Sequence, residues 1–242
     1  ITCRYYPNGN VILHVPRELA SPPEGFNFSS NEEFVNSLRT HKGIRENKMG
    51  TYSSINFKEK VFHSRQWDEL TETARGLFLN NITYEVVARG WKKSFNKGER
   101  EETKSESLQE TLAFPVRAYE KYNGFLGILG YDSHTKEPIF CSKSSIDTEF
   151  ARNFERIFRE SHNEVLPKLI ETMIESNVCF AFEVIDPIND PHIIEYNHEH
   201  VVLLDVIERN IVFKNWNYER LCEFARSNKL LYKHLSKTFD NW

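Results

Sequence analysis

Glycine is missing from the C-terminal part of this sequence. The chain of 242 residues contains ten glycines, and none of them follows Gly130. The phosphate-binding pattern G-x-x-x-x-G-K-[ST] is absent as well, which disfavours a P-loop kinase. Three of the ten glycines stand close together instead, as Gly124, Gly127 and Gly130 in the stretch AYEKYNGFLGILGY.

Cysteine is scarce, and its spacing matches no common metal or redox motif. The sequence has four cysteines and no C-x-x-C pair, so a structural zinc site or a redox pair is not expected. Cys141 and Cys179 stand in apolar runs and are expected to be buried thiols. This usage favours a reducing, intracellular setting, and we expect a cytoplasmic protein.

Long apolar runs and a surplus of positive charge are also lacking. There is no apolar run of about 18 residues and no signal-peptide pattern, so no membrane partner is expected. The formal net charge is -4, so any contact with nucleic acid has to come from local patches. Because the first residue is Ile1, we expect the native start to precede it.

Aromatic residues are abundant, and the apolar pattern predicts an α+β fold. Eighteen Phe and ten Tyr can build a sizeable core. Hairpin-like strands occur in blocks separate from helical patterns, which argues against a parallel doubly wound sheet. Strands are expected at 10–16, 73–79, 82–90, 118–131, 138–145, 178–185, 192–196 and 200–207. Helices are expected at 32–42, 150–174 and 219–235, with caps at Ser30 or Asn31 and at Ser145 or Asp147, and loops at 18–30 and 91–110.

Lys121 stands three positions before Gly124, at the entrance of an apolar strand. A K-x-x-G string is expected roughly once by chance, and a surface lysine at a turn is the simpler interpretation. Partial burial would lower the pKa of the lysine and free its amine as a nucleophile. Gly124 would permit a turn with positive φ, and Gly127 would leave room for a ligand against the sheet. Gly130 has no assigned role beyond a bend.

Three further stretches carry cations or a stacking ring. Arg75 precedes a strand, Lys93 and Phe95 follow the second strand of the same hairpin, and Lys143 ends the strand after the Lys121 strand. A phosphate site needs several fixed cations, and a purine site needs an aromatic face. The simpler interpretation of each is a solvated charge or an anchoring aromatic.

Glu183 is predicted to lie inside a strand. Alternation places it on one face with Cys179 and Ala181, opposite Phe180 and Phe182. Two small residues beside a carboxylate would leave room for a ligand, whereas the alternative is an edge-strand glutamate that faces water.

Two other stretches give weaker signals. His198 and His200 form H-x-H without an evident third ligand, so a solvated turn is favoured over a metal site. The segment DPINDP, with two prolines, is predicted to be a rigid turn.

Taken together, RGLFL, ARGWKKSFN, EKYNG, CSKSS and FEVIDPINDPHIIEY…VVLLDVI resemble, in order and spacing, the phage-type RNA ligase 1 and fungal tRNA ligase family. The resemblance covers about residues 60 to 210. K-x-D-G is the commonest lysine motif in the wider covalent nucleotidyltransferase superfamily, and Asn123 replaces its Asp here, as in the fungal branch. The resemblance implies an adenylyltransferase domain at 56–242, with antiparallel sheets around an ATP pocket and flanking helices, after an extension at 1–55.

The resemblance also implies a role for each candidate residue. Lys121 would attack the α-phosphate of ATP and hold AMP as a phosphoramidate. The ATP-site residues would be Arg75, Lys93, Phe95, Gly124, Lys143 and Glu183. Glu183 would contact ribose or a metal ion, with Mg²⁺ or Mn²⁺ expected. AMP would pass to the 5′-phosphate of an RNA end, which is then sealed to a 3′-hydroxyl end in RNA repair or tRNA splicing, with tRNA halves as one substrate.

One departure from the family leaves alternatives open. The family has a downstream E-G motif and a lysine pair, which this sequence lacks, and we expect them beyond Trp242. A non-catalytic nucleotide or RNA-end sensor, or an mRNA-capping-type guanylyltransferase that uses GTP, is the alternative. We expect a monomer, attached in some cases to end-healing or specificity domains.

Overall fold

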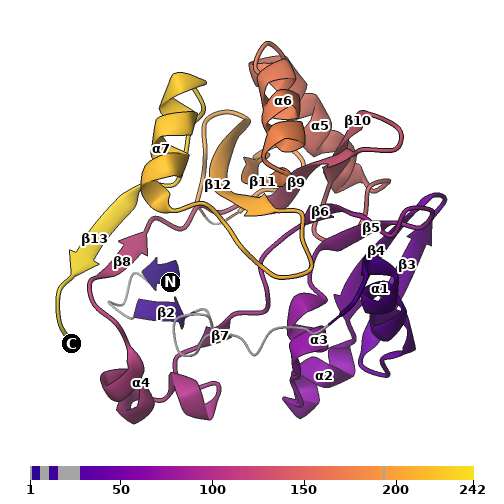
Figure 1. The fold of residues 1–242 in the computed structure, drawn as a ribbon. Coiled ribbons are helices and arrows are strands. Elements are labelled where there is room, and N and C mark those ends of the chain that lie inside the picture. Colours follow the sequence, from indigo (N-terminus) through magenta and orange to yellow (C-terminus); the bar gives the residue numbers. More distant parts are fainter. Residues whose placement is uncertain (1, 6–10, 16–27, 193) are drawn as a thin grey trace. The chain divides into compact units, whose positions relative to one another are not determined.

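The computed structural model describes residues 2–5, 11–15, 28–192 and 194–242, with side chains from residue 28 onward. The chain divides into two compact units. The small unit consists of Ile1–Gly25, Lys93–Tyr122 and Lys233–Trp242, and the large unit of Phe26–Lys92 and Asn123–Tyr232. The α+β prediction with antiparallel sheets is confirmed (Figure 1).

The first sheet of the large unit has four antiparallel strands in the order β3-β4-β5-β6. These strands are β3 (Ile44–Met49), β4 (Tyr52–Phe57), β5 (Leu77–Asn80) and β6 (Val86–Arg89). Helix α1 (Asn31–Thr40) is capped by Ser30, whose hydroxyl accepts the Glu33 amide as predicted. Its Phe34, Val35 and Leu38 pack into a core with strand residues such as Ile55 and Leu77. Helices α2 (Glu59–Ser64) and α3 (Glu69–Thr73) connect β4 to β5.

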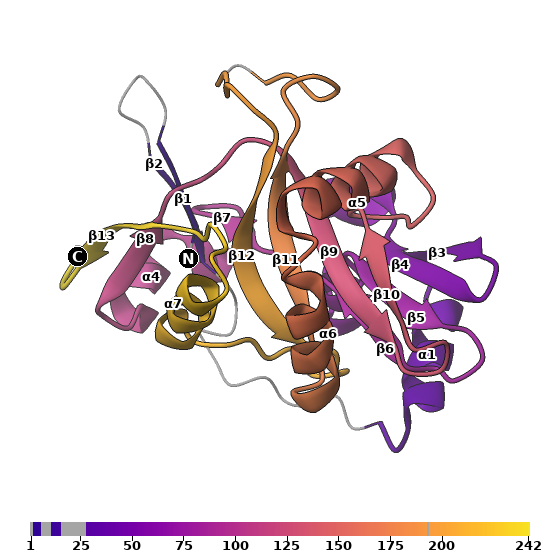
Figure 2. The same ribbon diagram turned by 90° about the horizontal axis from the view of Figure 1, so that it is seen from above.

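The second sheet of the large unit has the order β10-β9-β11-β12, again antiparallel. Its strands are β9 (Phe125–Asp132), β10 (Glu137–Cys141), β11 (Val178–Ile185) and β12 (His200–Glu208). One face packs against α5 (Glu149–His162), α6 (Leu166–Glu175) and α7 (Tyr218–Ser227) (Figure 2). Buried phenylalanines such as Phe154, Phe158 and Phe182 form this core.

The other face of the second sheet packs onto β5 and β6 of the first. The shared core includes Phe78, Val87, Ala88, Ile128, Cys141, Cys179 and Ala181. Gly130 allows this close approach, because a Cβ there would lie 2.2 Å from the Val87 carbonyl oxygen. Burial raises the pKa of the Cys179 thiol to about 11, and that of Cys141 well above its ordinary value. Both thiols are buried, as predicted.

The small unit contains two short sheets. Strands β1 (Thr2–Tyr5), β2 (Val11–Val15) and β7 (Phe95–Asn96) form one, and β8 (Val116–Tyr119) pairs with β13 (Leu235–Phe239) in the other. A 3-10 turn, η2 (Glu101–Thr103), and helix α4 (Ser105–Thr111) follow β7. The loop prediction for 91–110 was therefore wrong for these elements. The predicted loop at 18–30 falls mostly outside the described residues.

Several predicted boundaries were wrong. The stretch 118–131 is split into parts of two strands, because β8 pairs with β13 and only β9 pairs with β10. The last helix, α7, ends at Ser227 instead of 235. Thr148, not Ser145 or Asp147, caps α5, and the helical pattern breaks before α6. Residues 194–196 are not a strand, and Ile193 lies outside the described residues. Strand β6 begins only at Val86, because Asn80 accepts the Ile82 and Thr83 amides in a turn.

No helix among the described residues is both long and apolar enough to cross a membrane.

Candidate active site

Lys121 lies in the coil that connects β8 to β9. The chain passes from the small unit to the large unit directly after Tyr122. The Lys121 side chain is exposed, and its ammonium donates to the carbonyl oxygen of Tyr122. The expectation of an amine held near the protein interior was therefore wrong, because the strand that this stretch predicted is interrupted at residues 120–124.

The two residues that begin the large unit after this crossing have fixed backbone amides. The Asn123 amide donates to the Tyr196 hydroxyl at 3.1 Å, and the Gly124 amide donates to Glu183 Oε1 at 3.0 Å. Gly124 does not adopt a positive φ. Its lack of a side chain serves close packing instead, because a Cβ would lie 2.1 Å from the Val184 carbonyl oxygen.

Glu183 lies on the inner face of the second sheet and is only 6% exposed. Its strand, β11, runs between β9 and β12, so the edge-strand alternative is excluded. The room expected beside it is filled, since Cys179 and Ala181 pack into the core between the sheets. Gly127 does not clear space either, because a Cβ there would lie 2.8 Å from the Phe154 ring. The Glu183 carboxylate is therefore an acidic group at one end of a packed face of the second sheet, where the described side chains fill the predicted ligand space.

Arg75 and Lys143 lie together at the same end of the two sheets. A Cβ on Gly76 would lie 3.3 Å from the Lys143 carbonyl oxygen. A Cβ on Gly90 would lie 3.5 Å from the Arg75 carbonyl oxygen and 3.7 Å from Leu126, the register partner of Glu183. Three of the predicted residues, Arg75, Lys143 and Glu183, are thus held near one end of the inter-sheet core.

Arg45, on β3, is a third cation close to Lys143, in addition to Arg75. It lies opposite Asn56 in the register, and Asn56 accepts the Gly76 amide at 3.2 Å. Loss of hydration lowers the pKa of Lys143, and the charges of Arg75 and Arg45 lower it further. Burial also lowers the pKa of Arg75. Cations that repel one another in this way favour an anion between them.

Replacement of Arg75 by alanine is expected to raise the pKa of Lys143. A neighbouring positive charge favours the neutral amine, so its removal lets Lys143 keep its proton to higher pH. Arg45→Ala should raise the pKa of Lys143 by less. Arg220→Ala, which removes a charge on helix α7, should leave the pKa of Lys143 unchanged. Titration of the lysine Cε resonances by NMR measures this, and equal midpoints in all variants would contradict the cluster.

Lys93 and Phe95 belong to the small unit. The Lys93 ammonium lies 4.2 Å from the centre of the Phe95 ring, and the Arg100 guanidinium lies 4.4 Å from it. Phe95 is 2% exposed, so its ring is not presented as an open stacking surface. Lys93 also pairs with Glu99 at 3.4 Å. Their roles at an ATP site stay predictions.

The described residues contain no group of three or more His, Cys, Asp or Glu side chains placed to hold a metal ion. Glu183, the predicted metal residue, uses Oε1 to accept an amide. His198 and His200 have ring centres 5.3 Å apart, and nothing here supports a metal between them. Within the described part of the chain, these side chains therefore form no site for a resident metal ion.

Sequence reasoning missed Tyr196, Arg45 and Asn56. Arg45 and Asn56 are ordinary polar residues of two paired strands, and only the register brings them to Gly76. Tyr196 stands in a loop without periodicity, more than 70 positions from the amide that it accepts. No pattern in the sequence assigns a role to any of the three, although the motif FEVIDPINDPHIIEY ends at Tyr196.

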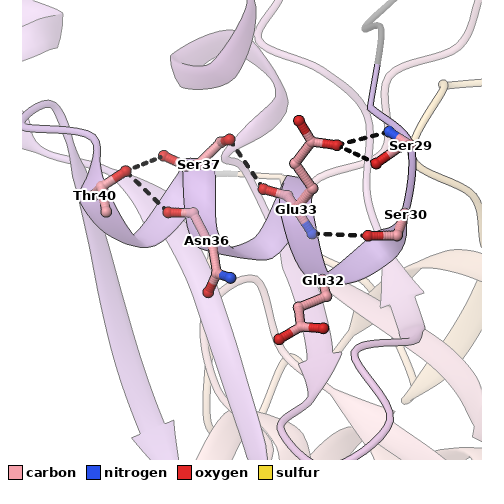
Figure 3. A pocket seen from close by; sticks show the side chains of 7 residues that line it. All are labelled: Ser29, Ser30, Glu32, Glu33, Asn36, Ser37 and Thr40. Carbon is pink, nitrogen blue, oxygen red and sulfur yellow. Dashed lines mark hydrogen bonds between the residues drawn. The ribbon is translucent and has the colours of Figure 1, made fainter.

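A hollow of about 450 Å³ lies along α1, away from these motifs. Figure 3 shows that its polar side chains bond to each other and to the helix backbone. The two bonds from Ser29 lower the pKa of Glu33. The lining carries two carboxylates and no cation, so it is not a phosphate site.

Comparison with models of protein families shows to which family this chain belongs. A family model described as RNA ligase, of the phage type, matches residues 73–242, which is more than half of the chain. The chain belongs to this RNA ligase family. The matched region contains all seven predicted site residues of this RNA ligase chain. Comparison with curated protein sequences gives no match.

Solved structures support the fold of this RNA ligase family member. Two solved structures of an archaeal ATP-dependent RNA ligase, form 1 and form 2, give TM-scores of 0.57 and 0.55, both at 16% identity. A putative ATP-dependent DNA ligase from Aquifex aeolicus gives 0.53, also at 16% identity. Each alignment covers 86% of this chain and 50% or 51% of the other. The chain therefore spans about half the length of these ligases.

Proposed function

We propose that this chain is the adenylyltransferase part of an ATP-dependent RNA ligase, with Lys121 as the nucleophile. One observation carries the proposal. In a chain of the RNA ligase family, the segment after an exposed lysine has two successive amides fixed, one of them by a buried carboxylate. This arrangement supports a lysine loop of fixed backbone that carries an exposed lysine side chain.

The proposed first step forms one bond and breaks one. The neutral Lys121 amine attacks the α-phosphorus of ATP, the N–P bond forms, and the P–O bond to pyrophosphate breaks. The amine releases its extra proton to solvent. The cations Arg75, Lys143 and Arg45 would stabilise negative charge on the phosphates, and Glu183 would hold the loop and contact the ribose.

Two further steps would complete sealing. The 5′-phosphate of an RNA end attacks the phosphorus of lysyl-AMP, which breaks the N–P bond and returns the amine. A 3′-hydroxyl then attacks that 5′-phosphate, and AMP leaves. The RNA partner, its end chemistry, tRNA splicing as the pathway, a divalent metal ion and a cytoplasmic location all remain part of the proposal.

Incubation with α-labelled ATP is expected to label the protein covalently at Lys121, as located by peptide mapping. A parallel incubation with α-labelled GTP separates the ligase from a capping-type guanylyltransferase. Addition of RNA with a 5′-phosphate should then chase the label onto the RNA end. Absence of label from either nucleotide, with binding retained, would instead favour a non-catalytic sensor.

A further inference from the structure

We infer that Tyr196 is a positioning residue for the nucleophile: its hydroxyl fixes the backbone two residues after Lys121 and thereby sets the placement of the lysine for attack. This inference rests on the proposed function, because it concerns the rate of that first step.

The hydrogen bond from Asn123 to Tyr196 is half of a two-point clamp. Asn123 and Gly124 are the first residues of the large unit after the crossing, and their amides are accepted by Tyr196 and Glu183. Both acceptors come from one hairpin, since Glu183 lies on β11 and Tyr196 in the connection to β12. The clamp orients two consecutive peptide units, which limits the freedom of the residues directly before them.

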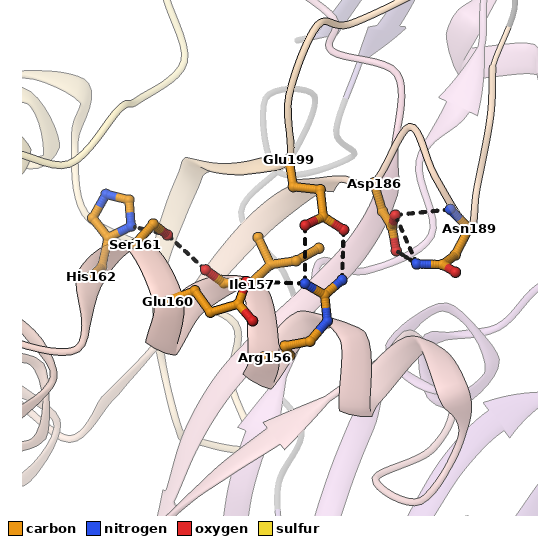
Figure 4. Close-up of polar contacts among 8 residues, drawn as sticks. All are labelled: Arg156, Ile157, Glu160, Ser161, His162, Asp186, Asn189 and Glu199. Atoms are coloured by element: carbon orange, nitrogen blue, oxygen red, sulfur yellow. Dashed lines mark hydrogen bonds and ion pairs between the residues drawn. The ribbon is translucent and has the colours of Figure 1, made fainter.

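The segment that carries Tyr196 is itself tied down. The Arg156 guanidinium on α5 binds Glu199 through two bonds, of 2.6 and 3.0 Å (Figure 4). These bonds to Glu199, with weaker effects of Glu160 and Asp186, raise the pKa of Arg156, so it stays charged at every working pH. The Tyr196 ring also packs edge-on against His200, the first residue of β12, at 5.7 Å.

The start of the same connection is closed by a carboxylate turn. Asp186 is 1% exposed, and its carboxylate accepts both the backbone and the side-chain amide of Asn189 (Figure 4). The turn predicted for DPINDP is thus present, with the Asp190 amide bonded to the Asp186 carbonyl at 2.9 Å. The connection between β11 and β12 is thus fixed near both ends, which holds the segment that carries Tyr196 in place.

Tyr196→Phe removes one oxygen and leaves the ring in place. The maximal single-turnover rate of Lys121 labelling by α-labelled ATP should fall about threefold to tenfold, the range that corresponds to the net effect of one hydrogen bond. The ATP concentration at half-maximal rate should stay within about twofold, because Tyr196 acts on the loop and not on the nucleotide. The pH midpoint of the rate should not move.

Tyr52→Phe is the matched control. Its hydroxyl donates to Asp132 Oδ2 at 2.7 Å, at the opposite end of β9 from the lysine segment. This variant should label at the wild-type rate. Glu199→Gln should slow labelling in the same direction as Tyr196→Phe but by less, because it weakens the tie to Arg156 without removing the hydroxyl.

Hydrogen exchange separates this inference from the proposed function. Tyr196→Phe should speed exchange at the Asn123 amide in the free protein, whether or not the protein reacts with ATP, while Tyr52→Phe should not. An unchanged labelling rate, a shifted pH midpoint or unchanged Asn123 exchange would overturn the inference. If wild-type protein takes up no label, the proposed function fails, and the exchange result alone decides whether Tyr196 holds the loop.

Discussion

Lys121→Ala should reduce covalent labelling by α-labelled ATP to background. The variant removes the only atom proposed to bond to phosphorus, and no other group in the mechanism can replace it. The side chain is exposed, so the fold should be unaffected. Gel autoradiography after incubation with ATP measures the label, and circular dichroism checks the fold.

Two further variants make this experiment specific. Lys121→Arg keeps the positive charge but replaces the amine with a guanidinium that stays protonated, so it should also fail to label. Lys60→Ala removes another exposed lysine, on α2, and should label at the wild-type level. Label that survives in Lys121→Ala would show that another residue is the nucleophile and would remove the basis of the proposed mechanism.

Gly130→Ala should destabilise the large unit by about 3 kcal/mol, at the upper end of what overpacking usually costs. A Cβ there would lie 2.2 Å from the Val87 carbonyl oxygen and 2.6 Å from the Ala88 Cβ. Both belong to β6 in the other sheet, and backbone cannot move aside as a flexible side chain would. The two sheets would have to separate locally, and urea unfolding followed by fluorescence measures the loss.

Gly90→Ala is the matched control for this prediction. Gly90 has no positive φ, and its added Cβ would meet nothing closer than 3.5 Å, which is ordinary contact. Its midpoint of unfolding should stay near that of wild type. Equal midpoints for Gly90→Ala and Gly130→Ala would mean that the sheets are less closely packed at Gly130 than described.

The sequence predicted well what is encoded locally. Strand β11 has the predicted bounds because its residues are apolar except for Glu183, and helix α1 begins directly after Ser30 because a hydroxyl there can accept the Glu33 amide. The lysine motif was also found locally, and the family match covers it. The α+β class followed from blocks of hairpins and helices, since neighbouring strands usually pair.

What failed depends on pairing between distant residues. The stretch before Lys121 was merged with β9 because nothing nearby shows that β8 pairs with β13. The helical pattern after Ser227 was continued because the competing partner of that segment stands more than 100 positions earlier. The roles predicted for the glycines were wrong for the same reason. A side chain at Gly130 would collide with Val87, and one at Gly127 would collide with Phe154. Within the site, Tyr196 could not be found from its own surroundings.

The pairing of β8 with β13 has a consequence for biosynthesis. Strand β13, at Leu235–Phe239, is synthesised more than 100 residues after β8, and until it has left the ribosome β8 lacks the strand that pairs with it. The strands of the large unit, which end at Glu208, can collapse on the nascent chain before that moment. The strand leading to Lys121 thus gains this partner only after β13 has been synthesised, so we expect a nascent chain that stops before Leu235 to lack a fully ordered lysine segment.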